Sequence, residues 1–245
     1  MNWQKTTIPL VIALPALALL FMEPIAQDQT YHSFPDQRAF LGIPNFMNVI
    51  SNIPFLLAGV AGLIHLARQN PKEGAHASWL IFFLGVALVF FGSSYYHWAP
   101  TDETLAWDRL PMTIGFMGLF TAIMSEYVHL KLERYLLIPA LFAGLLSVLI
   151  WRFYDDLRFY AFIQGAPLLA IPLAVVLFGR SQRHKRYLIY GLLFYLAAKM
   201  VEAYDSPVFA LSGMYISGHS LKHILASLGP LSIYFMLRRR SSDRK

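Results

Sequence analysis

The stretch ASWLIFFLGVALVFFGSSYYHW, residues 77–98, is almost free of polar side chains as far as Gly92. As an α-helix, its 22 residues span about 33 Å, enough to cross a hydrocarbon layer that is about 30 Å thick. The stretch therefore predicts a transmembrane helix, and the last turns of that helix carry Ser93 and His97.

Seven further segments share this length and apolar character. They are residues 7–23, 45–67, 105–128, 134–151, 158–179, 187–204 and 214–237. The chain has 245 residues, of which 57% are hydrophobic and only 14% charged, too few charges to cover a soluble domain. Helices satisfy their backbone hydrogen bonds locally in lipid, and the alternating pattern of a β-barrel is absent from the sequence. The predicted fold class is all-α, a polytopic transmembrane helical bundle.

Charges in the short loops predict the orientation. With a cytoplasmic amino terminus, 14 of the 20 Lys and Arg residues lie on the cytoplasmic side. They are Lys5, Arg68, Lys72, Lys131, Arg134, the Lys and Arg residues of the run Arg180 to Arg186, and those of the tail Arg238 to Lys245. The net charge of +6 thus reflects membrane topology, and no nucleic acid partner is expected. We predict a multi-pass protein of a bacterial inner membrane with both termini in the cytoplasm.

The first apolar segment, residues 7–23, also fits a signal peptide because it follows Lys5. A cut after Ala26 would follow Pro24 and Ile25, which is a poor cleavage pattern, so we favour an uncleaved helix. The predicted organisation is an amino-terminal transmembrane helix and extracytoplasmic loop over residues 1–44, a membrane domain over residues 45–240 and a basic cytoplasmic tail over residues 241–245.

Five polar side chains are predicted to meet at the outer end of the bundle. They are Ser93, His97, Asp108, His219 and His223. The predicted topology ends one helix and begins two others on the outer side, so the five side chains share one depth. Polar and ionisable groups inside a membrane are costly, and they mark functional sites by default.

His219 and His223 are spaced i, i+4, so both rings lie on one helix face and can bind one ion. Two histidines bonded to carbonyl groups or water are the alternative. His97 supplies a third ligand, and three neutral imidazoles leave Zn²⁺ one open position, where the pKa of water falls towards 7. The chain has no cysteine, so a metal must be bound by histidine, carboxylate or water.

Ser93 lies one helical turn before His97, on the same face, where its hydroxyl can approach an oxyanion; Ser94 points about 100° away. A serine at a helix contact is an equally weighted alternative. Asp108 begins the next helix, where a carboxylate can transfer protons or orient a ligand imidazole. It can instead stabilise the helix amino terminus or pair with Arg109.

These motifs carry a resemblance to a known family. The stretches GSSYYH at residues 92–97, WDRLPM at 107–112 and HSLKH at 219–223 resemble the alkaline ceramidase family of the CREST membrane hydrolases, as does NVISN at 48–52. The family pattern is Ser-x-x-x-His, an Asp eleven residues later and a late His-x-x-x-His, and all five positions match. The resemblance covers roughly residues 45–240.

The resemblance implies a seven-helix core, here with an additional amino-terminal helix, and hydrolysis of the amide of a ceramide-like lipid within the bilayer. Carried over by position, Zn²⁺ would be bound by His97, His219 and His223. Ser93 would help to stabilise the oxyanion, and Asp108 would transfer protons. Animal members bind calcium through an acidic cluster that is not reproduced here. Asn45 stands where an acid is expected, which makes calcium dependence doubtful.

Three other classes of protein fit parts of the pattern. A membrane receptor of the progestin and adipoQ type would share the zinc site without turnover. A haem protein would use His97 and one late histidine as axial ligands. A transporter would use the polar groups as a proton relay, although they gather at one end of the bundle. The open zinc position beside a carboxylate favours the enzyme.

Two further groups of polar residues lie near the predicted site. Residues 31–38 are interpreted as an ordinary interfacial loop with an aromatic belt; a lid or a headgroup reader is the alternative. Lys199, Glu202 and Asp205 either form ion pairs at i, i+3 spacing or face the same cavity.

Overall fold

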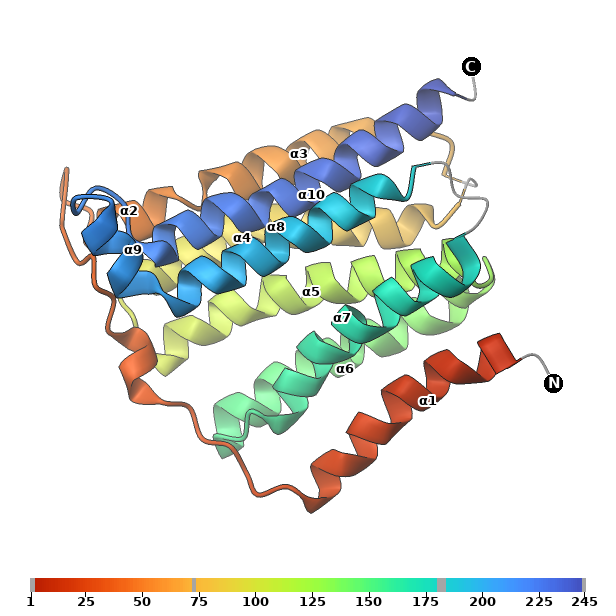
Figure 1. Cartoon of the computed structure of the whole chain (residues 1–245), viewed down its shortest axis with the longest axis horizontal. Coiled ribbons are helices and arrows are strands. Elements are labelled where there is room, and N and C mark those ends of the chain that lie inside the picture. The colour runs from red at the N-terminus through yellow and green to blue at the C-terminus, as the bar shows by residue number, and fades with distance from the viewer. Residues whose placement is uncertain (1–2, 72–73, 180–183, 244–245) are drawn as a thin grey trace.

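The computed structural model describes residues 3–71, 74–179 and 184–243, with side chains described from Thr7 onwards. These residues contain no strand and form a bundle of helices (Figure 1), so the predicted all-α fold class is confirmed. In chain order the helices are α1 Trp3–Ala18, α2 Phe46–Ile50, α3 Ile53–Ala67, α4 His76–Trp98, α5 Asp102–Tyr127, α6 Leu132–Tyr154, α7 Arg158–Phe178, α8 Arg186–Ala203, α9 Asp205–Leu211 and α10 Gly218–Ser242.

Five helical segments of the described chain are long and apolar enough to cross a membrane. They are Phe46–Ala67, which combines α2 and α3, and the helices α4, α6, α7 and α10. Helices α5 and α8 run beside them in the same bundle (Figure 1). The chain is therefore a multi-pass membrane protein.

The bundle has two ends of different character. Helix α1 begins and α10 ends at one of them, the terminal end (Figure 1). At the other, which we call the histidine end, α4 ends and α5 and α10 begin. Lys72, Arg180, Arg183, Arg244 and Lys245, which contributed to the predicted orientation, lie outside the described residues. The assignment of the terminal end to the cytoplasm stays a prediction.

The helices pack in an order that places α10 beside both α3 and α8. Helix α4 lies between α3 and α5, and α6 and α7 pack against α5. Helix α1 packs against α7 at the edge of the bundle (Figure 1). Proline occurs inside α5, α6 and α10, at Pro111, Pro139 and Pro230, where neighbouring helices can compensate for the lost backbone bond.

Two clusters of buried apolar side chains fill the bundle. The larger one reaches the terminal end and includes Trp79, Phe83, Ile123 and Met236. The smaller one lies at the histidine end and consists of Phe34, Tyr96, Leu105, Val148 and Trp151. The second cluster lies next to the histidines, because Tyr96 and His97 are neighbours at the end of α4.

The last helix begins later than the sequence predicted. Helix α10 starts at Gly218 and not at residue 214, because Ser217 acts as its N-cap, and the Ser217 hydroxyl accepts a hydrogen bond from the backbone N–H of Ser220. Met214 has a φ of 65°, which is incompatible with a regular helix. The short helix α9, which the sequence did not predict, precedes this turn.

Candidate active site

The structure brings the three predicted histidines together. His97 lies in the last turn of α4, and His219 and His223 lie in the first two turns of α10. All three side chains are buried, and their candidate ligand atoms lie within 4.8 Å of one another. Nε2 of His97 and Nε2 of His219 are 3.3 Å apart. In the described part of the chain, this is the one group of three or more His, Cys, Asp or Glu residues that could hold a metal ion.

A serine on another helix orients the third histidine. Nδ1 of His223 lies 2.8 Å from the hydroxyl of Ser51, which follows α2. The same hydroxyl lies 3.1 Å from the backbone carbonyl of Asn48, so it can donate to that carbonyl and accept the Nδ1 hydrogen of a His223 ring whose Nε2 atom binds a metal ion. Nε2 of His223 is then unprotonated. Hydrogen bonds of this kind fix the tautomer of metal-binding histidines. Sequence reasoning did not single out Ser51 as a functional residue.

The chemistry of the donor set fits zinc. Two Nε2 atoms at 3.3 Å require either a proton on one of them or a cation shared between them, because their lone pairs repel. Three imidazole nitrogens without a fourth protein ligand are typical of catalytic zinc sites. The residues present therefore satisfy the requirements of a bound Zn²⁺ ion.

Ser93 and Asp108 face each other across α4 and α5. A Cβ atom at Gly92 would lie 2.1 Å from the carbonyl oxygen of Trp107, so only glycine allows the two helices to approach this closely. The approach brings Ser93 and Asp108 close to each other at the histidine end. Ser94 points elsewhere, as predicted, and donates to the carbonyl of Val49.

Neither alternative for Asp108 agrees with the structure. Helix α5 starts at Asp102 with Thr101 as its N-cap, so the prediction that Asp108 begins this helix and stabilises its amino terminus is wrong. The pairing of Asp108 with Arg109 is wrong as well. The Arg109 guanidinium lies 3.9 Å from the ring centre of Trp151 and donates to Oε1 of Gln27 at 2.7 Å. Successive residues of a helix point about 100° apart, so the two side chains face different neighbours. The described structure contains no ion pair between them.

Helix α10 starts at a closely packed junction. A Cβ atom at Gly218 would lie 2.1 Å from the carbonyl oxygen of Val201 in α8. The backbone N–H of His219 donates to the carboxylate of Asp205 in α9 at 2.8 Å. Burial raises the pKa of Asp205, although this hydrogen bond opposes the shift. The junction fixes the position at which His219 enters the site.

The polar residues of α2 hold the surrounding elements in place. Asn48 is fully buried. Its side-chain amide donates to the backbone carbonyl of Asp36, and its side-chain oxygen Oδ1 accepts from the Ser220 hydroxyl at 2.7 Å. Asn45 precedes α2 with a φ of 46°, a backbone conformation that asparagine adopts more readily than most residues. Its amide donates to the carbonyl of His97 at 2.9 Å and so caps the end of α4.

The segment between α1 and α2 covers the histidines. The ring centre of Phe34 lies 4.8 Å from that of His97 and 4.7 Å from that of His219, and Phe34 is only 5% exposed. The buried carboxylate of Asp36 forms an ion pair with Arg38 at 2.7 Å. Phe34 and Asp36 of the predicted interfacial loop are thus buried at the site, whereas Tyr31, Ser33, Pro35, Gln37 and Arg38 are exposed, as predicted for an interfacial loop. The sequence offers no signal that selects Phe34 from the 19 phenylalanines.

Ion pairs connect α8 to the site. Glu202 pairs with Lys199, as the i, i+3 spacing predicted, and its Oε1 atom also accepts from Lys222 at 2.8 Å. Nζ of Lys222 lies 3.1 Å from Nε2 of His219. Lys222 is part of the HSLKH segment, but its contact with the histidine cluster was not predicted.

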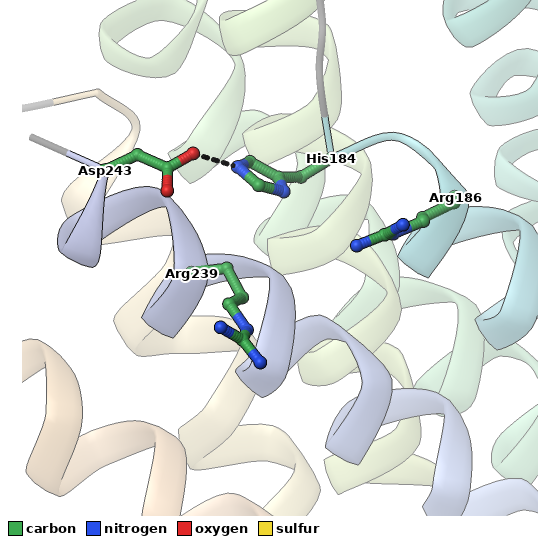
Figure 2. Close-up of a pocket in the computed structure, with 4 residues that line it drawn as sticks. All are labelled: His184, Arg186, Arg239 and Asp243. Carbon is green, nitrogen blue, oxygen red and sulfur yellow. Dashed lines mark hydrogen bonds and ion pairs between the residues drawn. The ribbon is translucent and has the colours of Figure 1, made fainter.

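Two surface pockets of the described structure lie at the terminal end, away from this chemistry. One is lined by His184, Arg186, Arg239 and Asp243 (Figure 2). Nε2 of His184 lies 2.9 Å from the Asp243 carboxylate, and the two arginine side chains extend into the same space (Figure 2). The pocket lacks the grouped imidazoles that make the histidine end a candidate site.

The fold and the three histidines define a class of protein. It is a multi-pass helical membrane protein with three buried histidines that could hold a metal ion. A family model described as Ceramidase matches residues 41–242, which is most of the chain. The chain belongs to the ceramidase family, so the resemblance seen in the sequence is confirmed. Membership indicates a membrane hydrolase of ceramide. No curated protein and no solved structure matches the chain significantly.

Proposed function

We propose that the chain is a zinc-dependent hydrolase that cleaves the amide bond of a ceramide-like lipid. The observation that carries the proposal is the burial of three imidazoles, with ligand atoms within 4.8 Å of one another, in a chain of the ceramidase family. The Ser93 and Asp108 pair at the same end of the bundle supports an enzyme.

His97, His219 and His223 would hold the zinc ion. When bound, zinc lowers the pKa of water at its open position towards 7 and so supplies a nucleophile at neutral pH. Ser51 keeps Nε2 of His223 unprotonated for this purpose, through the hydrogen bond at Nδ1.

Asp108 is the proposed proton carrier. Its carboxylate forms no ion pair with Arg109, whose guanidinium stacks on Trp151, and it lies close to Ser93. Asp108 would accept a proton from the attacking water and deliver it to the nitrogen of the leaving amine. Ser93 would donate a hydrogen bond to the oxyanion that forms on the carbonyl oxygen.

The apolar cluster at the histidine end, which includes Phe34, would exclude bulk water from the reacting groups. Phe34 belongs to the segment that precedes α2, and its ring contacts those of His97 and His219. The site lies at the end of the spanning helices, which is the depth of a lipid headgroup and of the amide in a ceramide. A water-poor site strengthens the interaction of Asp108 and Ser93 with developing charge.

The test is hydrolysis of ceramide by the purified protein, with zinc measured in each sample. Asp108→Asn should keep zinc and lose about 10²- to 10⁴-fold in turnover, the range of general acid–base catalysis. Asp102→Asn, in the first turn of the same helix, is the matched control and should retain turnover. Zinc-loaded wild-type protein without any hydrolysis would favour the receptor and reject the enzyme.

A further inference from the structure

The proposed mechanism gives no role to the partly buried charge of Lys222. Lys222 lies on α10 between the two histidines of HSLKH, and its side chain is 16% exposed. A charged group among apolar transmembrane helices is costly, and it persists where it serves a function. The contacts of Lys222 indicate what that function is.

The Lys222 ammonium group is held between Glu202 and the histidine cluster. Nζ donates to Oε1 of Glu202 at 2.8 Å and lies 3.1 Å from Nε2 of His219. The same Nε2 atom is 3.3 Å from Nε2 of His97, so the ammonium group reaches the cluster itself.

Metal binding would leave one donor of Lys222 without an acceptor. An ammonium group has three N–H donors and no acceptor, and one donor here is directed at Nε2 of His219. The lone pair of that nitrogen is used once it binds a metal ion. The ammonium group would then stand beside a second positive charge, and an anionic oxygen between the two relieves the repulsion.

We propose that Lys222 binds the carboxylate of the fatty acid that ceramide hydrolysis releases. The inference rests on the proposed function and extends it to the product. In the reaction the oxygen of water bonds to the acyl carbon, the C–N bond breaks and the nitrogen gains one proton. The second proton of water leaves when the fatty acid ionises. The fatty acid is the product with a negative charge, so a charge-assisted hydrogen bond from Lys222 selects it over the amine. Glu202 keeps its second partner, Lys199, when Lys222 turns to the product.

The experiment compares the binding of palmitate and of its neutral analogue palmitamide to the zinc-loaded protein. Wild-type protein should bind palmitate at least about tenfold more tightly. Lys222→Met should lose most of this preference, while its affinity for palmitamide and its zinc content stay unchanged. Lys199→Met is the matched control, because it removes the other lysine from Glu202 but has a side chain that is 57% exposed. It should retain the preference for palmitate.

Equal binding of the two ligands by wild-type protein overturns the proposal. So does an unchanged preference for palmitate in zinc-loaded Lys222→Met. Lys222→Gln is the second variant if the methionine variant does not fold. Binding of palmitate is measured without turnover, so the hypothesis of a product site and the hypothesis of a ceramide hydrolase can fail separately. Hydrolysis without a Lys222-dependent preference refutes the product site alone, whereas the preference without hydrolysis refutes the proposed enzyme.

Discussion

The two ends of the bundle carry similar residue types in very different settings. At the terminal end, His184 forms a single ion pair with Asp243 beside an open pocket (Figure 2). At the histidine end, His219 contacts two other imidazoles, a lysine and a phenylalanine, all under a covering segment. The comparison teaches that convergence of buried groups, and not the presence of a histidine near a helix end, marks the functional site.

The largest expected effect comes from removing a histidine at each end. His219→Ala deletes one of three imidazoles, so hydrolysis of ceramide should fall to background and zinc should be lost. His184→Ala removes the ion pair with Asp243 and a ring contact with Tyr187, both far from the histidine cluster, and should keep both properties. Activity and zinc content of the two purified variants make the comparison. Equal loss in both variants would show that the ends do not differ as described.

A substitution at the α8–α10 junction should have the next largest effect. The Cβ atom of Gly218→Ala would lie 2.1 Å from the carbonyl oxygen of Val201, which forces α10 away from α8. We expect a loss of about 1–3 kcal/mol in stability together with reduced activity, because His219 moves with the helix. Thermal unfolding in detergent and ceramide hydrolysis measure the two effects.

Gly165→Ala on α7 is the control for this substitution. Its Cβ atom would meet no atom within 4 Å, and alanine is the better helix former. Stability and activity should therefore be unchanged or slightly raised. If Gly218→Ala behaved in the same way, the close packing of α8 and α10 would not be needed for the site.

The hydrogen bond that orients His223 should have an intermediate effect. Ser51→Ala removes the acceptor at Nδ1, and loss of such a bond costs about 10- to 100-fold in metal affinity or activity. Ser227→Ala, on α10 beyond the site, loses only a bond to the carbonyl of Ile224 and should change neither. Zinc affinity is measured by competition with a chelator. An unaltered affinity in Ser51→Ala would remove Ser51 from the site.

The smallest expected effect concerns an ion pair at the edge of the histidine end. The hydrogen bond from Arg158 lowers the pKa of Asp156 below its ordinary value of 3.8. The pair therefore contributes stability above pH 3.8, and the contribution is lost as the pH falls through the lower value of the folded state. Arg158 also donates to the carbonyls of Leu19 and Met22, so the linker after α1 should loosen at low pH.

Pepsin cleavage of that linker between pH 2 and pH 4 tests the expectation. Cleavage of an unfolded substrate at each pH gives the pH dependence of pepsin itself. Relative to that rate, cleavage of the wild-type linker should become faster as the pH falls. Asp156→Asn should be susceptible throughout the range. The same pH dependence in both proteins would show that the ion pair does not hold the linker.

Much of the fold followed from the sequence, because apolar runs of sufficient length leave a chain few choices in lipid. The same logic placed His97 and His219 at one depth, since each lies at a predictable end of its helix. The start of α10 was misplaced because residues 214–217 are apolar enough to extend the run, and the capping role of Ser217 depends on its backbone conformation.

The remainder of the site depends on tertiary contacts that no local pattern encodes. Ser51 and Phe34 become informative only when α2 and the preceding segment are seen against His223 and His97. The absence of an ion pair between Asp108 and Arg109 likewise depends on a distant residue, because the Arg109 guanidinium stacks on Trp151. Each of these contacts joins residues that are distant in the sequence.

The metal content of the purified chain tests the central claim most directly. The account predicts about one zinc ion for each wild-type chain and almost none for His97→Ala, whose far-ultraviolet circular dichroism should stay that of a helical bundle. Hydrolysis of ceramide by a chain without bound metal, or full zinc occupancy in His97→Ala, would contradict the account.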